Sequence, residues 1–237
     1  HRARFAAVHH WVCPLECLRE EALKNTPLRP EQTKVISLAL EDSWFESKTK
    51  QTIARNEWGL PEKASVVGLF GRIDALKGHA DLLHAIAEPN AADWHALIIG
   101  ENTPNARGVD QLEALKKRAI ELNIANRVHW KPPSENLQSA YDCCDAYAMC
   151  SASETFGMVT IEAMARRVPV VGTDAGGTPE LLGNGSKGQL YRAGNHKQLA
   201  WSLENREKWP LPTSAQLAQF QRSVAVKQWQ DLLMHSR

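Results

Sequence analysis

The sequence predicts an α/β protein built on a doubly wound parallel sheet, with a partial segment of different organisation at its N-terminal end. Short apolar runs alternate with amphipathic segments about five times from Ala64 onward. Brief apolar runs of this kind are typical of strands that are buried on both faces. Hydrophobic residues make up 43% of the 237 residues, which is enough for a large core. Repeated strand–helix units connect through right-handed crossovers, so helices should cover both faces of the sheet.

Six apolar runs predict the strands of this sheet. They lie at 64–70, 95–100, 127–131, 145–150, 168–173 and, more weakly, 188–191. In open parallel sheets, ligands bind at the carboxyl ends of the strands, so the loops after these runs are where we expect a site.

Apolar residues at helical spacing predict helices between the strands. Leu82, Leu83 and Ile86 follow the first strand in this way. A second stripe consists of Val109, Leu112, Leu115, Ala119 and Leu122. Ser134, which is followed by Glu135, is expected to be the N-cap of a further short helix.

The first forty-odd residues are organised differently. We expect a strand over 5–12, a helix over 14–23 that has Pro14 in its first turn, and an extended run over 34–40. A polar stretch over 41–56 then crosses to the α/β domain. We interpret residues 1–46 as the tail of a preceding domain plus a linker, and residues 47–210 as the α/β domain.

A last helix is predicted over 214–234, with its apolar residues in two slightly shifted registers. Within the C-terminal segment 211–237, it should either pack on the α/β domain or bridge to a partner domain. At the other end of the chain, Phe5, Val8, Trp11 and Leu15 should pack against preceding elements. Some of these four side chains should therefore be unusually exposed or recruited into a dimer.

Charge and cysteine content exclude several classes of protein. Lys and Arg total 28 against 27 Asp and Glu, so a net charge of +1 argues against a nucleic-acid partner. The five cysteines show no zinc-binding spacing, and their odd, clustered arrangement favours a reducing compartment over a disulfide framework. No apolar run approaches the ~20 residues that span a bilayer. No charged-then-apolar leader opens the chain, so we expect no signal peptide and a cytoplasmic location.

The loop after the first predicted strand, VGLFGRIDALKG, carries two cations among glycines. Gly68 and Gly71 allow the backbone to approach a ligand closely, while Arg72 and Lys77 could grip the oxygens of a diphosphate. The alternative is a surface loop with incidental basic residues. The run matches neither GxGxxG nor GxxxxGK[ST], which disfavours dinucleotide and P-loop sites.

A second cluster, SASETFGMVTIEAMARRVPVV, contains two glutamates eight positions apart. Helical rise would separate Glu154 and Glu162 by roughly 12 Å. This exceeds the ~5–9.5 Å between the paired carboxylates of glycosidases, so the two are not expected to act on one bond as acid and nucleophile. They suit hydroxyls at opposite ends of a long polar ligand, with the N–H groups of Phe156, Gly157 and Met158 between them as an anion site. The alternative is an ordinary helix with a favourable glutamate at its start.

A third cluster, TDAGGTPELLGNG, offers Gly176 and Gly177. They either let the chain pass close to the second cluster or form a turn that needs positive φ, and we favour the turn. No DxD motif occurs in the chain, which removes the usual carboxylate clamp for a metal–nucleotide complex.

These three clusters, in this order, resemble the C-terminal domain of the family 4 glycosyltransferases, the "group 1" enzymes of the GT-B fold. The similarity runs from about Lys34 to Gly194, and ISLALED resembles the interdomain linker. Its most specific part, ETFGMVTIEAMARRVPVVGTDAGGTPE, resembles the Glu-x7-Glu motif of the family. The resemblance implies a Rossmann-like domain that forms the C-terminal half of a GT-B fold.

The resemblance also implies a donor site for a UDP-, GDP- or ADP-sugar. Arg72 and Lys77, beside Gly71, would neutralise the diphosphate, and Glu154 would hold the hydroxyls of the donor sugar. Glu162 would hold the ribose hydroxyls, and the backbone of Phe156, Gly157 and Met158 would contact sugar and phosphate. Arg72, Lys77 and Glu154 are the residues that we expect to act in catalysis, with retention of configuration and with no metal or other cofactor.

Three departures from the family pattern stand out. Thr155 stands where Gly or Pro is common, and Arg167 stands where Gly is usual. The segment WKPPS, residues 130–134, replaces a Gly-containing loop near the nucleotide base, so the identity of the base stays open.

The resemblance places the acceptor, a glycan or a lipid-linked sugar, mainly on the preceding domain. Such enzymes serve glycan or lipopolysaccharide synthesis, some of them at the cytoplasmic face of a membrane. The alternative is a non-catalytic module that binds a nucleotide sugar. A nicotinamide-dependent oxidoreductase is disfavoured because the glycine fingerprint is missing.

Overall fold

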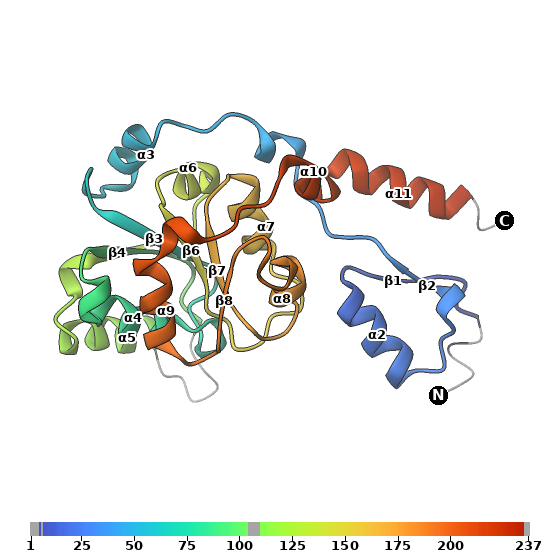
Figure 1. Cartoon of the computed structure of the whole chain (residues 1–237), viewed down its shortest axis with the longest axis horizontal. Coiled ribbons are helices and arrows are strands. Elements are labelled where there is room, and N and C mark those ends of the chain that lie inside the picture. Colours follow the sequence, from blue (N-terminus) through green and yellow to red (C-terminus); the bar gives the residue numbers. More distant parts are fainter. Residues whose placement is uncertain (1–4, 6, 104–109, 235–237) are drawn as a thin grey trace.

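A computed structural model describes residues 5, 7–103 and 110–234. Its centre is a six-stranded sheet in which all neighbouring strands are parallel, in the order β5-β4-β3-β6-β7-β8 (Figure 1). The strands are β3 (Ser65–Phe70), β4 (Trp94–Ile99), β5 (Val128–Lys131), β6 (Ala146–Met149), β7 (Val170–Thr173) and β8 (Gln189–Tyr191). All six predicted strands are therefore confirmed.

The sheet is doubly wound, as predicted. The chain builds outward from β3 to β5 and then returns to the other side of β3 to build β6, β7 and β8. The order of the strands thus reverses between β3 and β6, and their carboxyl ends form the switch point at which ligands bind in such sheets.

Helices cover both faces of the sheet (Figure 1). One core contains buried residues of α4 (His79–Ala87), α5 (Gln111–Glu121) and α9 (His196–Glu204). The opposite core contains buried residues of α3 (Gln51–Trp58), α6 (Leu137–Asp142), α7 (Met158–Ala165) and α8 (Thr178–Leu181). Successive residues of β3 enter opposite cores, Val66 one and Val67 the other, as the period of a strand requires. The predicted helices after β3 and β4 are confirmed, but Val109 of the second stripe lies outside the described residues.

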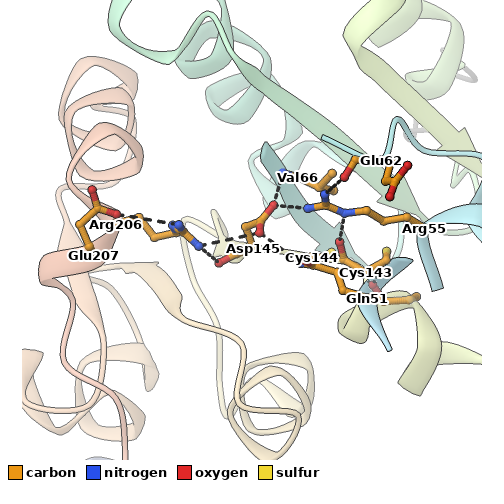
Figure 2. Close-up of polar contacts among 10 residues, drawn as sticks. Gln51, Arg55, Glu62, Val66, Cys143, Cys144, Asp145, Arg206 and Glu207 are labelled. Atoms are coloured by element: carbon orange, nitrogen blue, oxygen red, sulfur yellow. Dashed lines mark hydrogen bonds and ion pairs between the residues drawn. The ribbon is translucent and has the colours of Figure 1, made fainter. Parts of the chain in front are cut away.

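A polar network closes the amino ends of β3 and β6 (Figure 2). The carboxylate of Asp145 accepts hydrogen bonds from the N–H of Val66 at 2.8 Å and from the Arg55 guanidinium at 2.5 Å. Arg206, in the short 3₁₀ helix Arg206–Lys208, donates to the Asp145 carbonyl oxygen at 3.2 Å. This network ties α3 to the amino edge of the sheet. It therefore lies away from the carboxyl edge, where ligands bind in such sheets.

The N-terminal segment forms a small unit beside α8 (Figure 1). Strands β1 (Trp11–Cys13) and β2 (Thr33–Val35) pair in parallel, and α2 (Glu16–Asn25) connects them. The predicted strand over 5–12 is wrong in its first part, where the N–H of Val8 donates to the Phe5 carbonyl oxygen in a turn. The predicted extended run over 34–40 forms a strand only up to Val35 and pairs again at Leu40.

The helix predicted over 14–23 begins two residues later, at Glu16. Leu15 is its N-cap, so Pro14 precedes the helix and is not in its first turn. The N–H groups of Glu16 and Cys17 donate to the Glu180 carboxylate, at 2.7 and 2.8 Å. A carboxylate 164 positions away thus satisfies this helix N-terminus, which a local pattern cannot reveal.

The polar stretch 41–56, interpreted as a connection, contains regular structure. It includes a 3₁₀ helix over Asp42–Phe45 and the first turns of α3. Arg55 is buried because its guanidinium is satisfied in the network of Figure 2, so polarity here does not indicate exposure.

Two further helix boundaries differ from the prediction. Ser134 is not an N-cap, because α6 begins at Leu137 after Asn136, and the Ser134 hydroxyl instead accepts from the N–H of Asn136. The single helix predicted over 214–234 is wrong. It divides into α10 (Ser214–Leu217), a 3₁₀ turn (Ala218–Phe220) and α11 (Arg222–Met234).

The break before α11 lies at Gln221, which is extended and pairs with Leu40. The N–H of Leu40 donates to the Phe220 carbonyl oxygen at 2.8 Å, and the N–H of Arg222 donates to the Leu40 carbonyl oxygen at 2.9 Å. The two shifted apolar registers are thus two helices on either side of a strand-like crossing. From this crossing, α11 extends past the sheet toward the unit of β1 and β2 (Figure 1).

Exposure of the N-terminal apolar residues is mixed. Trp11 is 38% exposed, which confirms the expectation for that residue, whereas Leu15 is 4% exposed and packs in the core of the α/β unit. Recruitment of this segment into a dimer stays a prediction. Among the described residues, no helix is long and apolar enough to cross a membrane.

Candidate functional site

The loop after β3 presents Arg72 to solvent. Gly71 has φ +133°, and its carbonyl oxygen lies so close to Gly100 that a Cβ there would come within 1.8 Å. The Arg72 side chain is 63% exposed, with its guanidinium 3.3 Å from the Asp74 carboxylate. Asp74 also accepts from the N–H groups of Leu76 and Lys77, at 2.9 and 3.2 Å. Asp74 therefore caps the turn that carries Lys77, a role that its cap-forming residue type could have indicated.

The loops after β3 and β6 meet at an ion pair. The Lys77 Nζ lies 2.7 Å from the Glu154 Oε2, and the two side chains are 24% and 17% exposed. The close packing of Gly78 makes this contact possible, since a Cβ on Gly78 would lie 2.0 Å from the Cys150 carbonyl oxygen at the end of β6. The sequence predicts both residues at the site but does not predict their contact.

The glycines of the third cluster, Gly176 and Gly177, pack against the backbone of the loop that carries Glu154. Gly176 has φ +59°, and a Cβ on it would lie 2.2 Å from the Glu154 carbonyl oxygen. At this position the glycine thus serves both a positive-φ turn and a close approach to the second cluster. The N–H of Gly177 donates to the same oxygen at 2.7 Å. Gly177 has φ −80°, so our preference for a positive-φ turn is wrong at that position, and close approach to Thr155 explains the glycine.

Gly157 lies at the start of α7. It is the N-cap, with φ +90°, and Phe156 before it is buried in the core. Among the residues that the structure describes, the N–H groups of Phe156, Gly157 and Met158 have no hydrogen-bond acceptor. The amino end of this eight-residue helix can therefore accept an anion.

Glu162 lies on the half-exposed stripe of α7, with Met158 and Val159, while the other residues of the helix are buried. Burial raises the pKa of the Glu162 carboxyl, and a hydrogen bond from Tyr141 acts in the opposite direction. The Tyr141 hydroxyl donates to the Glu162 Oε2 at 2.7 Å. The sequence does not single out Tyr141, because this fully buried residue lies in an apolar segment that resembles ordinary core.

The charges divide across this edge of the sheet. Arg72 and Lys77 follow β3, and Glu154 and Glu162 follow β6. The cations can bind phosphate oxygens, and the carboxylates can accept hydroxyl hydrogen bonds. Over the described ranges, no group of three or more His, Cys, Asp or Glu side chains could hold a metal ion.

Known proteins with similar sequences are glycosyltransferases. The D-inositol 3-phosphate glycosyltransferase of Corynebacterium urealyticum is 38% identical over 141 residues, which cover 58% of this chain and 33% of that protein. The chain thus spans about a third of the length of that relative.

Solved structures are similar over most of the chain. The Anabaena protein HepE in complex with UDP is 26% identical, with a TM-score of 0.83 over 96% of this chain and 64% of that one. The C-terminal domain of a glycosyl transferase group 1 family protein from Francisella tularensis is 24% identical, with a TM-score of 0.61 over 79% of this chain and 93% of that one. The second similarity concerns the fold alone.

The family match covers most of the chain as well. Residues 50–223, which include the whole six-stranded sheet and each candidate site residue, match the family described as glycosyl transferases group 1. The chain belongs to the group 1 glycosyl transferases.

Proposed function

We propose that this chain is the donor-binding half of a hexosyltransferase that uses a nucleoside diphosphate sugar, retains configuration and needs no metal ion. The contact between Lys77 and Glu154 carries the proposal, because it joins the loops after β3 and β6 into one site. Arg72 lies on the same edge, and Glu162 follows on α7. Two cations and two carboxylates in this arrangement match the diphosphate, sugar and ribose of one extended ligand.

The cations are assigned to the leaving group. As the bond between the anomeric carbon and the diphosphate oxygen breaks, the diphosphate takes the electron pair and gains negative charge. Arg72 and Lys77 would stabilise that charge more strongly in the transition state than in the ground state. The incoming diphosphate would compete for the Lys77 ammonium, which frees the Glu154 oxygens for sugar hydroxyls.

The carboxylates are assigned to the two ends of the donor. Glu154 follows β6 and would hold the sugar, close to the positive charge that develops on the anomeric carbon. Glu162 would accept the ribose hydroxyls. The N–H groups of Phe156, Gly157 and Met158 would contact the sugar and the phosphate.

The similarity to HepE, which was solved with UDP, supports UDP as the nucleotide of the donor. GDP and ADP stay alternatives, because the segment WKPPS, residues 130–134 at the end of β5, departs from the family pattern near the base.

The acceptor is assigned to a part of the protein outside this chain. A glycan and a lipid-linked sugar are the acceptor classes that the family suggests, and the name of the Corynebacterium relative adds a phosphorylated polyol. We place the reaction in the cytoplasm, at or near a membrane surface when the acceptor is a lipid. Five free cysteines agree with a reducing compartment.

Calorimetric titration of the chain with UDP, GDP, ADP and their sugars tests the donor site. Saturable binding of at least one nucleotide is expected, together with a loss of about tenfold or more in affinity in Arg72→Ala and Lys77→Ala, since each removes a charge-assisted hydrogen bond. Arg118→Ala is the matched control, because that exposed arginine lies on α5 and pairs there with Glu121. A folded wild-type chain that binds none of the panel would refute the proposal. Binding without transfer by the whole protein would favour the non-catalytic module.

A further inference from the structure

A buried tyrosine hydroxyl lies behind one of the two site carboxylates. Tyr141, on α6, is fully buried and donates its hydroxyl proton to the Glu162 Oε2 at 2.7 Å. The same hydroxyl lies 3.2 Å from the Val159 carbonyl oxygen. A single proton bonds most strongly to the nearer, charged acceptor, so Glu162 is its main partner.

Aromatic neighbours fix the position of this hydroxyl. The ring of Tyr141 packs edge-on against Phe70, with 4.7 Å between ring centroids, and against Trp44, with 5.9 Å. Tyr147 packs at 5.4 Å, but its own hydroxyl bonds the main chain of Phe70 and not Glu162. Contacts on several sides prevent the Tyr141 ring from turning away from the carboxylate.

The segment 41–50, called the linker below, precedes α3 and packs onto the same turn of α6. Trp44, which contacts Tyr141, belongs to the 3₁₀ helix Asp42–Phe45. The next residue of α6, Asp142, accepts from the N–H of Thr49 at 2.8 Å and from the buried Arg166 at 2.6 and 2.9 Å. Tyr141, which bonds the Glu162 carboxylate, and Asp142, which bonds the linker, are therefore adjacent residues of α6.

The Glu162 carboxylate is left with one oxygen for a ligand. Its Oε2 bonds Tyr141, and its Oε1 has no hydrogen-bond partner among residues 5, 7–103 and 110–234. We propose that Tyr141 is a positioning residue that fixes the Glu162 carboxylate for the ribose hydroxyls, and that Trp44 of the linker holds Tyr141 in place. This inference rests on the proposed function, which assigns the ribose to Glu162.

Removing the Tyr141 hydroxyl should change nucleotide binding in two ways. The carboxylate loses its fixed orientation, and the pKa of Glu162 rises further because a bond to its charged form is lost. Ribose hydroxyls bind the charged form better, so the part of the pH dependence of nucleotide affinity that Glu162 contributes should move to higher pH in Tyr141→Phe. The terminal phosphate of the nucleotide also ionises at pH ~6, but it does so equally with both proteins, so the displacement relative to wild type reports Glu162. Tyr141 and Tyr147, which face Glu162, do not titrate there, since burial raises the pKa of each well above its usual value.

The test is calorimetric titration of the full chain with UDP, GDP and ADP in turn, between pH 5 and 8. Tyr141→Phe should bind the nucleotide about tenfold more weakly than wild type at pH 5.5, with the rise in affinity displaced to higher pH. Trp44→Ala should weaken binding in the same direction by about threefold. Tyr191→Phe, which removes another buried tyrosine hydroxyl in the opposite core, should bind like wild type.

A double-mutant cycle separates positioning from a general structural effect. In a Glu162→Gln background, Tyr141→Phe should have little further effect, because the group through which it acts is already altered. Equal affinity and an unshifted pH profile in Tyr141→Phe, while wild type binds nucleotide, would overturn the inference. Wild-type affinity in Trp44→Ala would overturn the linker part alone. Absence of binding by wild type would instead count against the proposed function.

Discussion

At the scale of single residues, Lys77 and Glu154 form one ion pair. The proposed function assigns Lys77 to the diphosphate and Glu154 to the sugar. The pair is largely shielded, at 2.7 Å, and each partner is held by a loop that glycines pack tightly. Neither side chain has to be ordered when a donor arrives, which lowers the entropy cost of binding. On the proposed function, a diphosphate would replace Glu154 at the Lys77 ammonium, so that this charge would stay paired throughout.

The two glutamates should differ in kinetic role. In the whole enzyme, Glu154→Gln should lower kcat strongly, because on the proposed function the carboxylate lies near charge that develops in the transition state. Glu162→Gln should chiefly raise the KM for the donor, because ribose hydroxyls do not change charge during transfer. Each effect should be about ten- to a hundredfold, the size expected for one hydrogen bond to a charged group.

Steady-state kinetics with varied donor concentration distinguishes these effects. Glu113→Gln, on the exposed face of α5, is the control and should behave like wild type. The division of roles fails if both site variants change kcat and KM alike, or if either keeps wild-type activity.

At the scale of elements, the start of α4 places Lys77. Gly78 takes the left-handed conformation between the Lys77 turn and α4, and it packs against the end of β6. The next residue, His79, is buried, and burial lowers its pKa from 6.5 to about 4. The His79 imidazole at the start of α4 is therefore neutral in the folded chain at neutral pH.

The stability of the chain should fall in weak acid because of His79. Its folded pKa of about 4 lies below the unfolded value of 6.5, so the unfolded chain binds more protons in that window. Stabilisation present above pH 6.5 is lost as pH falls toward 4, and the loss between pH 7.5 and 5 should be about 2 kcal/mol. Urea unfolding at several pH values measures it. His79→Leu should flatten the profile, and the exposed His9→Leu should not; an unchanged slope in His79→Leu would contradict the assignment.

Elements whose burial follows from local pattern could be predicted from the sequence. The inner strands β3, β4, β6 and β7 could be predicted because they are mostly apolar and buried on both faces. Helix α7 could be predicted because Gly157 and the residues after it form a recognisable start. The break at Gln221 could not be predicted, since it depends on pairing with Leu40, about 180 positions earlier. The burial of Arg55 depends in the same way on Asp145.

The candidate site was predictable as a set of residues and not as a set of contacts. Arg72, Lys77, Glu154 and Glu162 stand out by residue type and by their place after strands. The contacts Lys77–Glu154 and Tyr141–Glu162 join positions 77 and 21 residues apart, and no local spacing encodes them.

At the scale of the whole molecule, the switch between β3 and β6 gathers the site residues on one edge of the sheet. The opposite edge is closed by the network around Asp145, and the N-terminal unit is attached at separate points. Those points are the crossing of Leu40 with Gln221 and the Glu180 carboxylate at the start of α2. All the candidate site residues thus lie within the α/β unit.

The most direct test of this account is a crystal structure of the chain with the nucleoside diphosphate sugar that binds best in solution. Diphosphate oxygens should lie within hydrogen-bond distance of Arg72 and Lys77, with the Lys77–Glu154 pair opened. Sugar hydroxyls should lie on Glu154, and ribose hydroxyls on Glu162. A donor bound elsewhere, or bound here with its ribose away from Glu162 and its phosphates away from both cations, would contradict the account.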